Sequence, residues 1–183
     1  MQNFDVVIPQ NNEKELIDMA VQLGLSGLVF LSTDINYICS VTDNPIEIRK
    51  AYILKDVSEV NKARKRFDMV FAYAERRFFE SGADYIIRAE LSDRKDSFHY
   101  RNTSLNQVHA KLAKHNKISI VFNFDILLNS DFKSKQFFLG RMMQNAVLVK
   151  KYKLGRESFS LAKRPEQMRS RTILDAFKKI LCI

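Results

Sequence analysis

Short apolar runs alternate with helical patterns along the chain. The runs are four or five residues long, and several are continuous, as in parallel strands that are covered on both faces. These patterns predict seven strands, at 4–8, 28–31, 51–54, 69–73, 84–88, 118–122 and 158–161.

The segments between these runs carry helix start and stop signals. Asn12 and Glu15 have the spacing of a capping box, and Gly24 is placed to end the same helix in a left-handed conformation. Further helices are predicted from Ser58, over 75–81, over 105–115 with Ser104 and Gln107 as a capping box, over 134–152, and from about Arg171. Residues 32–48 give no clear pattern.

Repeated strand–helix units predict a parallel α/β fold with right-handed crossovers. Seven strands fit either an atypical or incomplete (β/α) barrel or a doubly wound sheet. Neither G-x-G-x-x-G nor G-K-[ST] occurs, which argues against the doubly wound folds that bind nucleotides. No linker, repeat or low-complexity segment divides the chain, so residues 1–183 are expected to form one domain.

Composition is that of a soluble globular protein, with 46% hydrophobic and 28% charged residues. No apolar run approaches the roughly 18 residues that span a bilayer, and the first ten residues do not resemble a signal peptide. Cys39 and Cys182 are far apart and match no metal-binding spacing. We therefore expect reduced thiols in a cytoplasmic protein.

Positive charge is concentrated in the second half of the chain. Residues 1–90 hold 11 Lys/Arg against 14 Asp/Glu, whereas residues 91–183 hold 19 against 7, within a net charge of +9. Such segregation favours a polyanionic partner. Nucleic acid is favoured over a membrane, because no strongly basic amphipathic helix with exposed aromatic residues stands out.

Catalytic residues are sparse. His99, His109 and His115 surround a single predicted helix instead of lying at several strand ends, and none forms H-x-H. Asp5 and Glu90 could line the mouth of a barrel, but two carboxylates do not make a metal site. No G-x-S-x-G motif occurs either.

Basic residues fall into two groups by their expected position. Those expected on the rim formed by the carboxyl ends of the strands are Arg76, Arg77, Arg94, Lys95, Lys163 and Arg164, and those expected nearer the opposite rim are Lys150, Lys151, Lys153 and Arg156. Arg94 has the strongest individual claim to a phosphate, because a guanidinium can grip it with two hydrogen bonds, and Lys95 and Arg101 would add positive field.

The sequence also resembles archaeal ribonuclease P protein component three, which is homologous to the thirty-kilodalton subunit of the eukaryotic enzyme. The resemblance rests on the Arg94-Lys95-Asp96 loop, the helix containing Asn106-Gln107-Val108-His109-Ala110-Lys111-Leu112, and the strand and loop at 118–124 with Leu127 and Leu128. The segments 76–87, Lys151-Tyr152-Lys153 and Phe159-Ser160 are also similar. Two departures are Gln107, where the family has histidine, and the extra segment 100–105.

This resemblance implies an atypical TIM-like barrel related to the polymerase-and-histidinol-phosphatase fold. It also implies a non-catalytic subunit that stabilises the catalytic RNA of ribonuclease P while the 5′ leader is removed from precursor tRNA. The protein would bind no cofactor itself, since magnesium belongs to the RNA, and it would pair with protein component two. That partner, or self-association, is expected to cover any open sheet edge.

RNA-binding residues are predicted from the same resemblance. The first choices are Arg94 and Lys95, and the second choices are Arg76, Lys117, Lys151 and Arg169. Two alternatives stay open: a metal-dependent phosphoesterase of the same barrel superfamily, and a general RNA-binding assembly protein.

Overall fold

Seven parallel strands form a single sheet in the computed structural model, which describes residues 3–39, 41, 44–92, 95–96 and 98–181. Their spatial order follows the chain, as in a barrel built by repeated right-handed crossovers. The strands are β1 (Phe4–Val7), β2 (Gly27–Ser32), β3 (Glu47–Ile53), β4 (Met69–Tyr73), β5 (Tyr85–Ile87), β6 (Ser119–Asn123) and β7 (Gly155–Phe159). All seven predicted strands are confirmed, with β3 beginning earlier and β7 ending earlier than expected.

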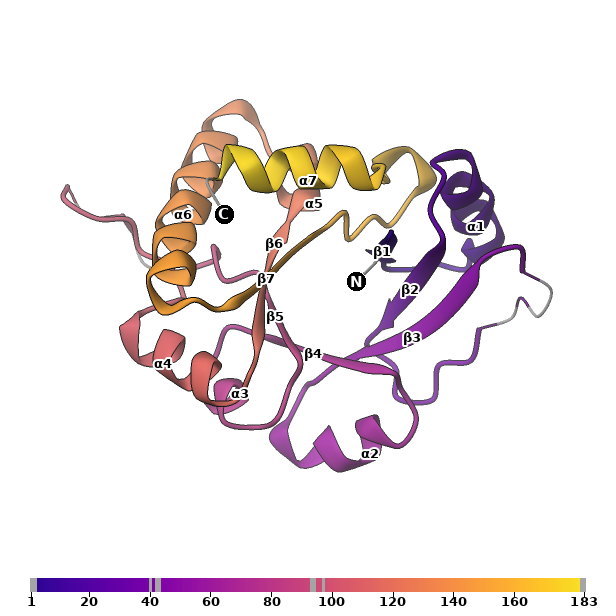
Figure 1. Cartoon of the computed structure of the whole chain (residues 1–183), viewed down its shortest axis with the longest axis horizontal. Helices are drawn as coiled ribbons and strands as arrows, with labels where there is room; N and C mark the ends of the chain where they lie inside the picture. Colours follow the sequence, from indigo (N-terminus) through magenta and orange to yellow (C-terminus); the bar gives the residue numbers. More distant parts are fainter. Residues whose placement is uncertain (1–2, 40, 42–43, 93–94, 97, 182–183) are drawn as a thin grey trace.

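Helices surround the sheet on its outer side, and the strands curve around a common centre (Figure 1). The helices are α1 (Glu13–Gln22), α2 (Val60–Arg64), α3 (Arg76–Phe79), α4 (Gln107–His115), α5 (Phe124–Asn129), α6 (Phe132–Tyr152) and α7 (Arg171–Ile180), with 3-10 turns η1 (Val57–Glu59) and η2 (Pro165–Gln167). In the described part of the chain, no helix is both long and apolar enough to cross a membrane.

β1 and β7 are the two edge strands of the sheet, and the segment that follows β7 forms hydrogen bonds with β1. Leu161 N–H donates to the Val6 carbonyl at 2.9 Å, and Ile8 N–H donates to the Ala162 carbonyl at 2.8 Å. Beside these bonds, the Asp5 carboxylate accepts from Ser160 N–H at 2.8 Å. The barrel is therefore nearly closed by the chain itself, through the segment that follows β7.

Apolar side chains fill both faces of the sheet. Inside the barrel, one cluster joins residues from every strand: Phe4, Val6, Val29, Leu31, Ala51, Ile53, Met69, Phe71, Ile87, Val121, Phe159 and Leu161. Two further clusters pack the outer face against the helices. Because both faces are covered, the strands read as continuous apolar runs, as the sequence suggested.

Several helix starts differ from the predictions. The side chain that caps α4 is Asn106, which accepts from His109 N–H, whereas Ser104 donates to the Leu91 carbonyl; the predicted capping box is therefore wrong. Similarly, Asp56 forms the capping box of η1 in place of Ser58. In each case a neighbouring Asp or Asn accepts the free N–H groups of the first turn.

One other expectation also needs correction. The Asn12 side chain makes no cap hydrogen bond and instead donates to the Lys163 carbonyl across the barrel seam. Gly24 is confirmed in the left-handed conformation, with φ +67°.

Candidate functional site

The predicted RNA-binding residues lie on two opposite rims of the barrel. Arg76 follows β4, Lys95 follows β5 and Arg169 follows β7, so these three belong to the carboxyl-end rim. Lys117 precedes β6 and Lys151 precedes β7, so they belong to the amino-end rim. Arg94 lies outside the described residues, so its predicted role stays a prediction.

Lys95 is exposed on a loop that is fastened by its neighbour Asp96. The Asp96 carboxylate accepts from Asn102 N–H at 2.9 Å and pairs with Arg101 at 3.1 Å. Asn102 in turn donates its side-chain amide to the Lys95 carbonyl. The loop therefore holds the Lys95 main chain in place and leaves its ammonium group facing solvent.

Arg141 of α6 is the residue that ties this loop to the barrel, and it was not predicted from the sequence. It pairs with Asp96 at 2.9 Å, and its guanidinium also donates to the carbonyls of Glu90 and Ser92 at 3.3 and 3.4 Å. Burial would raise the pKa of Asp96, but the hydrogen bonds from Asn102, Arg141 and Arg101 outweigh burial and lower this pKa.

Arg101 shares the Asp96 carboxylate with Arg141, so the positive charge of the two arginines is only partly offset. The Arg101 guanidinium pairs with Asp96 and lies 5.7 Å from the centre of the Phe137 ring. Arg169 is also occupied: it donates to the carbonyls of Glu166 and Met168 and lies over the Phe124 ring. Arg101 and Arg169 therefore organise the protein around them.

Arg76 is open to solvent, with 72% of its side chain exposed. It forms an ion pair of 3.7 Å with Glu80, one helical turn later. Exposed pairs of this kind contribute little and are easily exchanged for another anion. Arg76 therefore remains available to a ligand, although Glu80 offsets part of its field.

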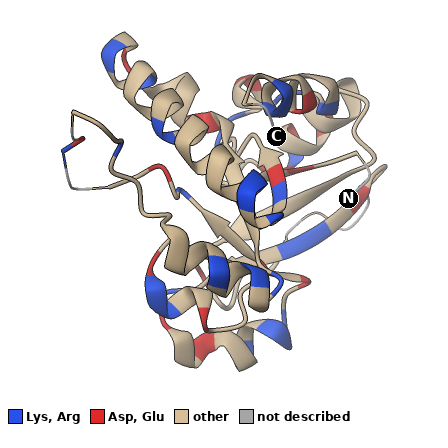
Figure 2. Cartoon of the chain, turned by 60° about the vertical axis from the view of Figure 1, so that its left-hand side comes forward, with Lys and Arg blue, Asp and Glu red and all other residues tan. Residues whose placement is uncertain are grey.

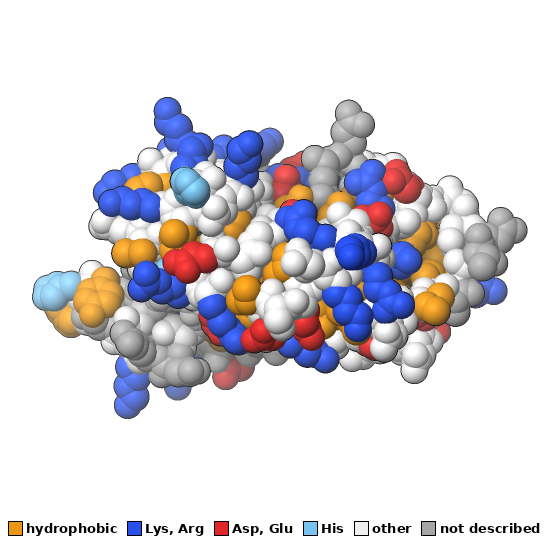
Figure 3. All heavy atoms as spheres, turned by 90° about the horizontal axis from the view of Figure 1, so that it is seen from below, with side chains coloured by type: hydrophobic (Ala, Val, Ile, Leu, Met, Phe, Trp, Pro, Cys, Tyr) orange, Lys and Arg blue, Asp and Glu red, His pale blue; other side chains and the backbone are white. Residues whose placement is uncertain are grey.

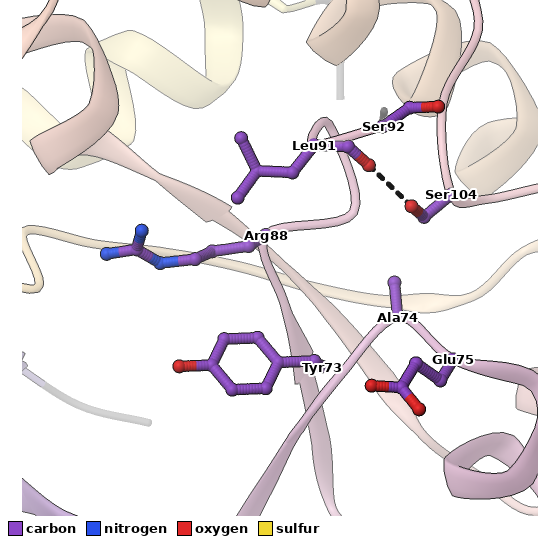
Figure 4. Close-up of a pocket in the computed structure, with 7 residues that line it drawn as sticks. All are labelled: Tyr73, Ala74, Glu75, Arg88, Leu91, Ser92 and Ser104. Carbon is purple, nitrogen blue, oxygen red and sulfur yellow. Dashed lines mark hydrogen bonds between the residues drawn. The ribbon is translucent and has the colours of Figure 1, made fainter. Parts of the chain in front are cut away.

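The mouth of the barrel holds two adjoining cavities of about 340 and 320 Å³, which share Arg88 and Leu91 as lining residues. Figure 4 shows the first cavity, where Tyr73 and Arg88 extend toward the same side. Arg88 pairs with the buried Asp125 at 3.0 Å. Lys163 lines the second cavity.

Two carboxylates lie beneath this mouth. Burial raises the pKa of Glu90 to about 7, and the Asn123 amide donates to it at 2.7 Å. Burial also raises the pKa of Asp125, despite the nearby Arg88 guanidinium. Within the described residues, no group of three or more His, Cys, Asp or Glu side chains is placed to hold a metal.

The remaining candidate residues are not at the mouth. Asp5 is buried at the seam between β1 and β7, and burial raises its pKa to about 6, so the expectation that it lines the mouth is wrong. The His109 ring stacks on Phe79 at 4.7 Å and its Nδ1 contacts the Ser104 carbonyl. His109 is half-buried.

The amino-end rim carries a set of exposed cations. We call it the lysine rim; its members are Lys111, Lys114, Lys117, Lys150, Lys151, Lys153 and Arg156. None of them forms an ion pair within the part of the chain that the structure describes. Figure 2 shows basic residues on α4 and α6, and Figure 3 shows many basic side chains on the face seen from below.

The first half of the chain contrasts with the lysine rim. Four of its arginines form ion pairs: Arg49 with Glu47, Arg64 with Asp84, Arg77 with Asp56 and Glu75, and Arg88 with Asp125. Arg66 and the lysines of this half form none among the described residues, but they are spread over α1, β3, α2 and the adjoining segments instead of lying together on one rim. Unpaired charge, rather than total charge, sets the field that a polyanion meets. The lysine rim is therefore a stronger candidate for phosphate contacts than the sequence indicated.

The architecture defines a nearly closed parallel (β/α) barrel with seven strands. Similar solved structures include a chain in the cryo-EM structure of archaeal ribonuclease P with mature tRNA, at a TM-score of 0.74 and 20% identity, covering 97% of this chain and 82% of that one. No protein-family profile matches the sequence, and no curated protein sequence is detectably similar.

A second similar structure is histidinol phosphate phosphatase from Lactococcus lactis in complex with zinc, L-histidinol and phosphate. Its TM-score is 0.55 at 9% identity, covering 99% of this chain and 93% of that one. An uncharacterized protein matches at a TM-score of 0.50 and 8% identity. At such identities the likeness shows the fold alone, and it confirms the predicted TIM-like (β/α) barrel.

Proposed function

We propose that this chain is a protein subunit of ribonuclease P that binds and stabilises the catalytic RNA. The observation that carries the proposal is the structural likeness to a chain of archaeal ribonuclease P, which extends over 97% of this protein. The phosphatase is less similar, at a TM-score of 0.55 against 0.74. The local resemblance around Arg94-Lys95-Asp96 in the sequence points the same way.

The charges of the protein support an RNA partner. Lys95 and Arg76 are exposed on the carboxyl-end rim, and Lys117 and Lys151 belong to the lysine rim. Contacts from such side chains to phosphates fix the position of an RNA and carry little sequence information. That is the behaviour expected of a subunit that stabilises a folded RNA.

Catalysis in this proposal belongs to the RNA, with magnesium bound to the RNA and no cofactor on the protein. The mouth of the barrel is consistent with that division of labour. Glu90 accepts a hydrogen bond from Asn123, and one oxygen of Asp125 pairs with Arg88. The proposal includes protein component two as a partner, precursor tRNA as the substrate of the complex, and a cytoplasmic location.

A metal-dependent phosphoesterase is the second candidate, because the phosphatase shares the fold and two carboxylates lie at the mouth. The donor set does not fit a metal centre of that kind, since a guanidinium occupies one side of Asp125. Stoichiometric zinc or manganese, together with phosphoesterase activity of the purified chain, would establish this candidate instead.

Reconstitution tests the proposal. Ribonuclease P RNA and component two would be mixed with or without the chain at low magnesium, and cleavage of precursor tRNA would be measured. The expected result is stimulation by the wild-type chain. Lys95→Ala should reduce the stimulation, and Lys133→Ala, which removes an equally exposed lysine at the start of α6, should preserve it. No stimulation by the wild-type chain would refute the proposal.

A further inference from the structure

The lysine rim contains two helix ends with the same unusual residue choice. α4 and α6 each end in a turn whose left-handed position is a lysine: Lys117 with φ +57° and Lys153 with φ +50°. Side chains with a Cβ are disfavoured in this conformation, and glycine is the usual choice there. Each lysine therefore adopts a backbone conformation that its side chain disfavours.

A third turn of the same barrel provides an internal comparison. After α1, Gly24 N–H donates to the Val21 carbonyl and Leu25 N–H donates to the Ala20 carbonyl. The same two bonds recur from Lys117 to Lys114 and Ile118 to Ala113, and from Lys153 to Lys150 and Leu154 to Val149. The residue after each turn, Leu25, Ile118 or Leu154, is buried. The same turn conformation therefore has glycine at its left-handed position after α1 and lysine at that position after α4 and after α6.

The two lysine turns lie side by side. Ser119 of β6 pairs with Gly155 of β7, and each lysine stands two residues before its member of this pair. Neighbouring parallel strands are about 4.8 Å apart, so the turns are close neighbours. Gly155 keeps them together, since a Cβ there would lie 2.2 Å from Ser119 Oγ.

A third ammonium group joins them, because Lys114 Nζ donates to the Lys153 carbonyl at 2.9 Å. Lys114, Lys117 and Lys153 line one cavity of about 270 Å³, together with Ala113, Ile118, Leu154 and Gly155. No carboxylate lines it, and the three lysines form no ion pair within the described residues. Like charges held together in this way repel one another until an anion neutralises them.

We propose that the paired turns of α4 and α6 form a phosphate-binding site for the backbone of an RNA helix, with Lys117 and Lys153 as the gripping residues and Lys114 as a third cation. The site lies at the amino ends of β6 and β7, on the rim opposite Lys95. The identity of the RNA rests on the proposed function, whereas the site itself rests on the turns. A chain that holds RNA at both rims would contact two RNA segments.

Glycine substitution separates binding from folding at these positions. Lys117→Gly and Lys153→Gly keep the left-handed turns, so the Tm should stay unchanged or rise by about 2–4 °C at each site. Affinity for a labelled 20-base-pair RNA duplex should fall. Each phosphate contact adds about 0.9 to the slope of log K against log salt. At 0.1 M salt, losing one contact should therefore weaken the affinity about eightfold, and losing both should weaken it about 60-fold.

Matched controls sharpen the test. Lys62→Ala with Lys133→Ala removes the same charge from two other exposed helix positions, and it should change the affinity less than fivefold. Lys117→Arg with Lys153→Arg keeps the charge and should retain affinity within about twofold. Gly24→Lys places lysine in the third turn, where an added Cβ meets open space, so any loss of Tm reports the backbone conformation alone.

The outcomes distinguish this inference from the proposed function. Equal losses for the glycine pair and the alanine pair would overturn the phosphate site, as would duplex affinity unchanged by the glycine pair. A chain that stimulates precursor-tRNA cleavage normally with both glycines would also count against the site while leaving the subunit role intact. Duplex binding that depends on the two lysines, without any stimulation of cleavage, would support the site and refute the subunit role.

Discussion

Removing the charge of Asp96 should loosen the loop that presents Lys95. In Asp96→Asn, the ion pair with Arg141 is lost, and the new amide nitrogen would place a donor against the guanidinium of either Arg101 or Arg141. Asn102 N–H could still find the remaining side-chain oxygen. The change is therefore electrostatic and nearly isosteric.

The two ion pairs of Asp96, one with Arg141 and one with Arg101, should contribute unequally to the stability of the protein. Arg141 and Asp96 are both 11% exposed in their side chains, so breaking their pair leaves a buried guanidinium, which typically costs about 3–5 kcal/mol. The carbonyls of Glu90 and Ser92 still accept from Arg141, which favours the lower end, about 3 kcal/mol. Arg101 is 44% exposed, so its arm should contribute about 0–1 kcal/mol.

Urea and thermal denaturation of Asp96→Asn, Arg141→Gln and Arg101→Ala would measure these terms. A loss of about 3 kcal/mol predicts a Tm lower by about 6–12 °C for a chain of this size. The double variant Asp96→Asn/Arg141→Gln should lose less than the sum of its single variants, because the charges are coupled. A larger loss of stability for Arg101→Ala than for Arg141→Gln would refute the conclusion that Arg141 is the residue that anchors the loop.

The pH dependence gives a second check on the same pair. The pKa of Asp96 is lowered in the folded protein from an ordinary value of 3.8. Its stabilising effect should therefore be complete above that value and disappear as pH falls through the lower folded pKa. The difference in free energy of unfolding between the wild type and Asp96→Asn should be constant from pH 6 to 8 and should become smaller in acid. A difference that grows in acid would contradict the mechanism.

Two further predictions concern a buried carboxylate and two glycines. Burial raises the pKa of Glu90 from 4.5 to about 7. The contribution of Glu90 to stability is therefore complete below pH 4.5 and is lost as the pH rises to about 7. Over that range the free energy of unfolding, measured by urea titrations at each pH, should fall by about 3 kcal/mol more for the wild type than for Glu90→Gln. Gly27→Ala should lower the Tm more than Gly24→Ala, because a Cβ at residue 27 would lie 2.5 Å from the Glu47 carbonyl oxygen, whereas residue 24 has open space and costs only its left-handed conformation, about 1 kcal/mol.

The sheet could be predicted because its signal is local. Each strand is a short apolar run that is buried on both faces, and the turn at Gly24 follows from glycine's tolerance of positive φ. Helix starts were less predictable, since Asn106 and Ser104 are both good caps two residues apart. The structure chooses between them by giving Ser104 another partner, the Leu91 carbonyl.

The anchoring of the Lys95 loop could not be predicted, because its partners are distant in sequence. Asp96 meets Arg141 across 45 residues, and nothing local distinguishes Arg141 from the other cations of α6. The sequence therefore did not show that Arg101 shares the Asp96 carboxylate with Arg141. Charge totals identify a basic half of the chain, but only the pairing pattern identifies which cations remain available.

The lysine turns left a local signal that charge counting does not use. Leu23-Gly24-Leu25, Asn116-Lys117-Ile118 and Tyr152-Lys153-Leu154 each follow a helix and precede a strand, with an apolar residue directly after the central position. Aligning these helix ends places both lysines where the first turn has glycine. A count of total charge treats every lysine alike. The comparison of helix ends instead identifies Lys117 and Lys153, because both must adopt a left-handed backbone conformation. The same comparison can be made in any repeating strand–helix barrel, where each unit serves as a control for the others.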